Sequence, residues 1–204
     1  MTISVACFTM NFPSGSNIRN TMRHPIPAQL AAPETLEFCQ KIVPDVHPVL
    51  LNSDPFPEAE EMDCFANVEQ AIAKNGGRAV YGWAIWQVPG VYIEAEFHCV
   101  WENHAREMLD VTPYPYRMDN ILFLPDSTRI YKGQQVDNIR QALVNDSDVT
   151  RWLYLARKRF EILNKGDLSN QHGRIELPPK LAKEFRKVLE EAERLDSRLK
   201  RRYP

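Results

Sequence analysis

The sequence lacks the features that define several large classes of protein. No run approaches 18 consecutive apolar residues, so we expect no membrane-spanning helix and no membrane partner. None of the four cysteines forms a CxxC pair, which argues against zinc-ribbon and thioredoxin-type motifs. The phosphate-loop pattern GxxxxGK followed by Ser or Thr is absent as well, so Gly76-Gly77 is predicted to stop a helix rather than to bind phosphate.

The start of the sequence does not resemble a targeting segment. Residues 1–12 contain no Lys or Arg before their apolar residues, so we expect no signal peptide. Four cysteines in 204 residues are too few for a disulfide scaffold. We therefore expect a cytoplasmic protein with reduced thiols.

A net charge of only −2 hides an asymmetry along the chain. Residues 1–149 hold 10 Lys and Arg against 19 Asp and Glu, a net of −9, whereas residues 150–204 hold 15 against 8, a net of +7. A basic tail can bind nucleic acid, but mutual attraction of the two parts or a solvated helix explains it as well, and we do not expect a nucleic-acid partner.

The pattern of apolar residues predicts an α+β protein. Residues 1–12 are predicted as a strand, the Pro-rich residues 13–33 as a loop, residues 33–39 as a short helix, and Asp63 as the N-cap of a helix that Gly76-Gly77 ends. Runs rich in aromatic and β-branched residues predict four strands, at residues 79–87, 91–101, 107–111 and 121–124. The prediction is an α+β domain over residues 1–147, irregular in its Pro-rich N-terminal part, with a helical appendage over residues 148–204.

Two amphipathic helices are predicted in the appendage. In residues 148–164 apolar side chains recur every three or four residues. After Pro178-Pro179 a narrow seam of the heptad type follows, formed by Leu181, Phe185, Val188, Ala192, Leu195 and Leu199. We expect the seam to pack on the helix of residues 148–164, with pairing to a second chain as the alternative, so the protein is expected to be a monomer or a dimer through this helix.

The best candidate for chemistry begins with Cys64, in the first turn of the helix that follows Asp63. The partial positive charge of a helix N-terminus favours the thiolate, the nucleophilic form of cysteine. Cys64 lies at the edge of the apolar stripe, which suits a group at the rim of a cleft. Four acidic residues within residues 58–63 oppose ionisation of the thiol, and a small buried hydrophobic residue is the alternative interpretation.

A histidine and a carboxylate follow on two predicted strands. Strand alternation puts His98 on the same face as Glu94 and Glu96, and the opposite face is predicted to be core. If the turn around Asn103 holds three or five residues, Asp110 lies directly opposite His98 and can accept its imidazole N–H. A loop of two or four residues would turn Asp110 to the other face.

Cys64, His98 and Asp110 resemble the nucleophile, base and acid of the papain-like cysteine enzymes, especially the transglutaminase-like group and the arylamine N-acetyltransferases. The resemblance covers residues 63–113 and rests on residue type, order and predicted element. It implies a papain-like core of one helix and an antiparallel sheet. The Arg-Gly-Gly-x-Cys run of the arylamine transferases is absent, because Glu60-Glu61-Met62-Asp63 precedes Cys64. No Trp directly follows Cys64, and Phe65 stands at the position where transglutaminase-like enzymes often carry an aromatic residue.

The expected function is thiol-dependent acyl transfer, most simply hydrolysis of an amide, peptide or isopeptide bond, with no cofactor. Asn67, Trp83 and Glu96 are expected to bind a peptide or small amide substrate. Two alternatives stay open. Glu94, Glu96 and His98, with Cys64 or Asp110, could bind a metal, although no known metal motif is present. The protein could also be a binding or regulatory protein that keeps this fold without catalysis.

Overall fold

The computed structural model describes residues 2–5, 25–171 and 173–204 and divides the chain into two compact units. The sheet unit consists of residues 26–87 and 93–132, and the helical unit contains the described parts of residues 1–25, 88–92 and 133–204. The predicted strand of residues 1–12 is described only at β1 (Thr2–Val5), and the rest of it lies outside the described residues.

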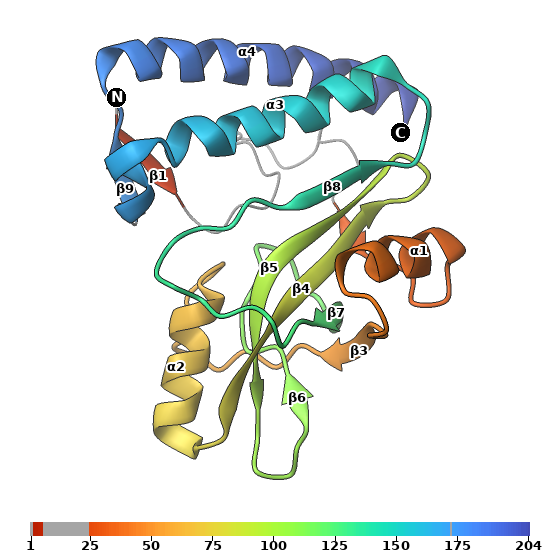
Figure 1. Cartoon of the computed structure of the whole chain (residues 1–204), viewed down its shortest axis with the longest axis vertical. Coiled ribbons are helices and arrows are strands. Elements are labelled where there is room, and N and C mark those ends of the chain that lie inside the picture. The colour runs from red at the N-terminus through yellow and green to blue at the C-terminus, as the bar shows by residue number, and fades with distance from the viewer. Residues whose placement is uncertain (1, 6–24, 172) are drawn as a thin grey trace. The chain divides into compact units, whose positions relative to one another are not determined.

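The sheet unit is built around an antiparallel sheet with the strand order β3-β7-β4-β5-β6 (Figure 1). Its strands are β3 (Val49–Asn52), β4 (Arg78–Val88), β5 (Tyr92–Glu102), β6 (Met108–Leu109) and β7 (Asn120–Pro125), and β2 (Ile26–Pro27) pairs with β4. The α+β class is thereby confirmed. The short apolar run at residues 49–51 forms the edge strand β3, paired antiparallel with β7.

Two helices complete the sheet unit. Helix α1 (Pro33–Ile42) begins with Pro at its first position, as expected, and buries Phe38 and Cys39. Helix α2 (Cys64–Asn75) begins after the N-cap Asp63, whose carboxylate accepts the backbone N–H of Ala66. These predictions of the sequence are confirmed, because short-range capping signals fix helix ends locally.

Strand β5 lies between β4 and β6 and is buried on both faces. On one face Val100 packs with Trp86, Ile121 and Phe123. On the other face Cys99 packs with Cys64 and Val68 of α2. Polar side chains of β5 are therefore enclosed, and the face that carries Glu94, Glu96 and His98 is not a solvated surface.

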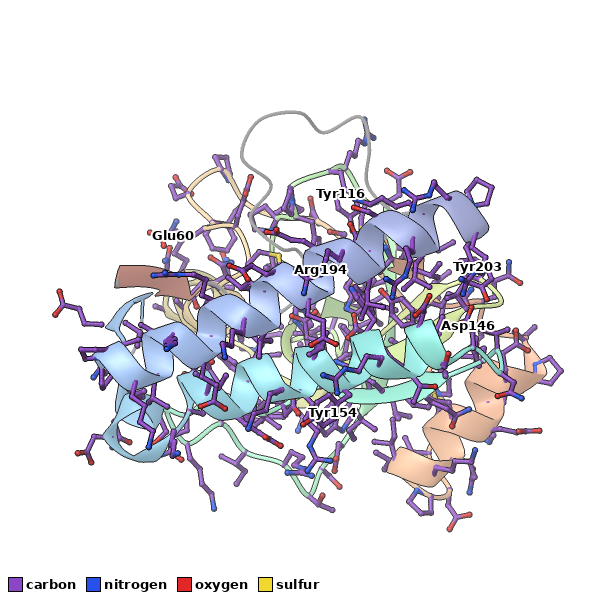
Figure 2. All side chains as sticks on the ribbon, turned by 90° about the horizontal axis from the view of Figure 1, so that it is seen from above. Glu60, Tyr116, Asp146, Tyr154, Arg194 and Tyr203 are labelled. Atoms are coloured by element: carbon purple, nitrogen blue, oxygen red, sulfur yellow. The ribbon has the colours of Figure 1, made fainter. Side chains whose placement is uncertain are left out.

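The helical unit pairs α3 (Ser147–Leu163) with α4 (Pro179–Arg202), which run side by side in Figures 1 and 2. Their ion pairs show an antiparallel arrangement, since Arg198 bonds Asp148 while Glu184 meets Lys158. The predicted seam of α4 is buried against α3 within the chain: Trp152, Leu155 and Ala156 of α3 share one core cluster with Phe185, Val188, Ala192, Leu195 and Leu199 of α4, and Leu181 is partly buried against it. The seam of α4 thus packs on α3 of the same chain.

The end of α4 is held at the start of α3. Arg198 and Arg202 both bond carboxylates there. Figure 2 shows Asp146 and Tyr203 at the same end of the helix pair, where the Tyr203 hydroxyl donates to Oδ2 of Asp146 at 2.8 Å. Asp146 is also the N-cap of α3, so one carboxylate both begins α3 and holds the end of α4.

Short elements around these helices were not predicted. Strand β9 (Gly173–Glu176) pairs antiparallel with β1, and a short 3-10 helix, η1 (Gly166–Asn170), precedes it. Strand β8 (Ile139–Ala142) is followed by Leu143, whose N–H bonds the carbonyl of Val91 at 2.8 Å. In the part of the chain that the structure describes, no helix is long and apolar enough to cross a membrane.

Candidate functional site

Cys64 is the first residue of α2 and is buried rather than at the rim of a cleft. Its exposed fraction is 1%, and it packs with Val68, Cys99 and Val111. The interpretation that Cys64 lies at the rim of a cleft is wrong, because side chains of β5 and of the segment after β6 pack around the helix start. Burial alone would make Cys64 an inert core residue, so its polar contacts decide what it can do.

His98 supplies that polar contact. The imidazole is 3% exposed, and its Nε2 lies 3.1 Å from Oδ1 of Asp110. Cys64 acts on the same imidazole, because its charge and a side-chain hydrogen bond both raise the pKa of His98. The three predicted side chains therefore lie near one another, with the imidazole as the common neighbour of the thiol and the carboxylate.

The register that brings Asp110 to this place differs from the predicted one by two residues. Trp101 pairs with Leu109 and Glu102 with Met108, so Val100, rather than His98, is the residue that the ladder places opposite Asp110. The turn is centred on residues 104–106, with Arg106 in a left-handed conformation at φ 67°. Because the register differs by an even number of residues, Asp110 still lies on the predicted face of the sheet. The hydrogen bond between Asp110 and His98 therefore forms although the predicted register was wrong.

Asp110 is held at both carboxylate oxygens. Besides His98, Oδ1 accepts the backbone N–H of Thr112 at 3.2 Å, and Oδ2 accepts the hydroxyl of Tyr114 at 2.9 Å. The backbone of Asp110 is fixed as well, because its N–H bonds Asn52 and its carbonyl accepts the N–H of Asp54. Sequence reasoning missed Tyr114, although a hydroxyl four residues after a buried carboxylate was the available signal.

The electrostatics of the site favour a charged imidazole. Burial by itself lowers the pKa of His98, but the charges of Cys64 and Asp110 and the hydrogen bonds to both hold it well above its usual value of 6.5. The imidazole of His98 thus interacts with Cys64, the first residue of α2.

The other described thiols have no such partner set. Burial raises the pKa of Cys39 to about 11. Burial, together with the nearby Cys64 and Glu69, raises the pKa of Cys99 far above its usual value. Cys7 lies outside the described residues. Among Cys39, Cys64 and Cys99, Cys64 is therefore the thiol most suited to nucleophilic chemistry.

The three residues expected to bind substrate have contacts within the protein. Asn67 is fully buried and clamps the backbone of Glu60, with its Nδ2 donating to the carbonyl at 2.8 Å and its Oδ1 accepting the N–H at 2.9 Å. Trp83 donates to Asp126, and Glu96 accepts from the indole of Trp86. All three are at most 3% exposed, so none meets a substrate in this conformation.

The alternative of a metal centre receives no geometric support. In residues 2–5, 25–171 and 173–204, no group of three or more His, Cys, Asp or Glu side chains has an arrangement that could hold a metal ion. The carboxylate Oε2 of Glu96 accepts the indole N–H of Trp86 at 2.9 Å.

Comparisons with protein-family models, with curated proteins and with solved structures gave no match to this chain. The class of the site therefore rests on its own geometry.

Proposed function

We propose that the sheet unit carries a thiol-dependent acyl-transfer site, with Cys64 as nucleophile, His98 as general acid and base, and Asp110 as the residue that orients the imidazole. The observation that carries the proposal is the buried His98–Asp110 hydrogen bond together with the action of Cys64 on the same imidazole. The resemblance to papain-like cysteine enzymes supports the same assignment.

The proposed reaction is hydrolysis of an amide, peptide or isopeptide bond in two steps. The Cys64 thiolate attacks the carbonyl carbon, and the C–N bond breaks as the His98 imidazolium gives its proton to the leaving nitrogen. A thioester on Sγ remains. His98 then takes a proton from water, the hydroxide forms a new C–O bond, and the C–S bond breaks to release a carboxylic acid and restore the thiolate.

Asp110 has two tasks in this scheme. As an acceptor at Nε2 it fixes the tautomer that leaves the other ring nitrogen toward the reacting atoms, and as an anion it stabilises the imidazolium. Its own three hydrogen bonds, from His98, Thr112 and Tyr114, hold the carboxylate in place.

Burial of the site favours a second candidate function. Cys64, His98 and Asp110 are each at most 3% exposed, so a substrate reaches Sγ only after neighbouring side chains move. A binding or regulatory protein would use the same network only to hold the sheet unit together. The two functions differ in one observable, the covalent intermediate on Cys64.

The test is to trap that intermediate with a general acyl donor, p-nitrophenyl acetate, and to locate the acetyl group by mass spectrometry. We expect acetylation of Cys64 in the unaltered chain and its loss in Cys64→Ala and His98→Gln. Cys39→Ala is the matched control, because it removes a thiol that is as deeply buried as Cys64 and whose pKa is raised by burial. Acetylation that persists in Cys64→Ala, or equal acetylation of Cys39 and Cys64, would refute the catalytic proposal and leave the binding function.

A further inference from the structure

Asp110 makes more contacts than a three-residue site requires. Donors approach it from two opposite sides: His98 and the N–H of Thr112 at Oδ1, and the hydroxyl of Tyr114 at Oδ2. The terminal torsion of an aspartate is broad and roughly twofold, so the side chain alone does not set the plane of its carboxylate. A donor on the far oxygen sets that plane.

Tyr114 is itself held firmly in place. Its ring meets Trp86 edge to face, with 5.4 Å between the ring centroids and 73° between the planes, and it packs against the core cluster that includes Val100 and Phe123. Trp86 in turn donates its indole N–H to Glu96 at 2.9 Å. A chain of specific contacts thus fixes the direction in which the Tyr114 hydroxyl points.

We infer that Tyr114 is a fourth member of the site, a positioning residue whose hydroxyl holds the carboxylate of Asp110 in the plane that meets His98. The inference rests on the proposed function for its catalytic meaning. Tyr114 does not touch the reacting atoms, and it acts through Asp110 on the imidazole.

The charges around Tyr114 keep it a hydrogen-bond donor. Burial, followed by the neighbouring carboxylates Asp110 and Glu96, raises its pKa well above 10, so the phenol remains protonated at every pH at which the site could work. The titratable groups that act on this network are Cys64 from α2, Glu96 and His98 from β5, and Asp110 from the segment after β6. Of these, His98 reports directly on the state of Asp110.

The experiment follows the titration of His98 by NMR in the full chain. The background is Cys64→Ala, so that the thiol does not titrate together with the imidazole. Tyr114→Phe, Asp110→Asn and the double variant are compared with that background. Tyr81→Phe is the control, because it removes a phenol hydroxyl from an aromatic cluster of the same unit, formed with Phe65 and Phe97. Circular dichroism and thermal melting verify that each variant folds.

We expect Tyr114→Phe to lower the pKa of His98, Asp110→Asn to lower it further, and the double variant to match Asp110→Asn alone. With Cys64 restored, Tyr114→Phe is expected to slow alkylation of Cys64 by iodoacetamide about threefold to tenfold at neutral pH, the effect of one ordinary hydrogen bond. In the Asp110→Asn background, Tyr114→Phe is expected to cause no further decrease in the rate of Cys64 alkylation.

Two results would overturn the inference. A rise in the pKa of His98 in Tyr114→Phe would mean that the hydroxyl only withdraws charge from Asp110. An equal effect of Tyr114→Phe in both Asp110 backgrounds would show a merely structural role. Failure of acetylation at Cys64 removes the proposed enzyme function and leaves these titrations unaffected, so the two failures are distinguishable.

Discussion

The sheet unit and the helical unit differ in where their charged side chains lie. In the sheet unit, the carboxylates of Glu94, Glu96 and Asp110 are at most 3% exposed. Glu96 accepts a hydrogen bond from an indole, and Asp110 bonds an imidazole, a phenol and a backbone N–H. In the helical unit, the ion pairs that join α3 to α4 lie at the surface beside an apolar seam, as with Arg151 and Glu191.

This difference separates two uses of polar residues. A buried ionic network contributes little net stability compared with an apolar core of the same volume, because removing charges from water costs several kcal/mol per ion. The helical unit has its stability from apolar burial and uses ion pairs only to refine the pairing of helices. Burying His98 and Asp110 costs desolvation free energy in the sheet unit. This cost is consistent with the chemical role proposed for the two residues.

The largest expected effect is on the helical unit. Deleting residues 178–204 removes α4 and exposes the apolar stripe of α3, including Trp152 and Leu155. Burial of the six seam side chains is worth several kcal/mol at roughly 25 cal/mol per Å2, so we expect α3 to lose its fixed structure. Fluorescence of Trp152 as the sole tryptophan, after conservative replacement of the other three, measures this loss. Unchanged Trp152 emission would contradict it.

Removing Asp110 should be the largest single-residue effect in the sheet unit. Asp110→Ala leaves His98, Tyr114 and the N–H of Thr112 without their acceptor in a buried site. We expect a loss of about 3–5 kcal/mol in the free energy of unfolding, measured by urea denaturation. Glu191→Ala in the helical unit is the contrasting control. A cost below about 1 kcal/mol for Asp110→Ala would remove the distinction between the two units.

Asp146 should give an intermediate effect with a defined pH dependence. Arg202 comes first among the groups that lower the pKa of Asp146, to about 2, and the Tyr203 hydroxyl and the N–H of Asp148 add to it. Because the folded pKa lies below the unfolded one, the stabilisation is present above roughly pH 4 and is lost as the pH falls through 2.

Asp146→Ala also removes the N-cap of α3, so we expect a cost of about 1–2 kcal/mol at neutral pH. The difference between this variant and the unaltered chain should shrink in urea titrations below pH 4. A difference that is constant from pH 7 to pH 2 would exclude the carboxylate as its source.

The smallest effect is expected at the exposed ion pair of α3 and α4. Arg151 and Glu191 form two hydrogen bonds, of 2.7 and 3.0 Å, but both side chains are more than a third exposed. A double-mutant cycle with Arg151→Ala and Glu191→Ala should give a coupling of about 0.2–1 kcal/mol that falls with added salt. A salt-independent coupling above about 2 kcal/mol would show that this pair resembles the buried network.

The sequence predicted most of the long elements but not the way they enclose the site. Capping at Asp63 and Pro33 and the periodicity of α3 and α4 are local signals, so these helices were found. Strand β9 was missed because a four-residue strand that pairs with β1, far away in the sequence, has no local signature. The hairpin register was wrong by two because Arg106, a residue without a glycine's freedom, adopts the left-handed turn position.

At the candidate site, the sequence pattern predicted the three candidate catalytic residues correctly as neighbours, but it did not predict the residues that surround them. Cys64, His98 and Asp110 were found from residue type and element, and the structure brings them together, while their catalytic role stays a prediction. Asn67, Trp83 and Glu96 look like cleft residues in the sequence, because a polar group satisfied inside the core and one that meets a ligand follow the same pattern. Only the contacts in the structure distinguish a polar side chain that is satisfied inside the core from one that meets a ligand.

Helix α2 connects Cys64 to a turn at the other end of the helix. At its far end the carbonyl of Gly76 accepts the indole N–H of Trp101 at 2.8 Å, and a Cβ on Gly77 would lie 2.2 Å from the carbonyl oxygen of Glu102. Glu102 is the last residue of β5 before the hairpin that leads to Asp110, and α2 is about 18 Å long. A side chain at position 77 would clash with this hairpin and push the end of α2 away from it. Gly77 is thus a place where a change remote from the thiol, with no contact to it, would alter the spacing between Cys64 and the acid.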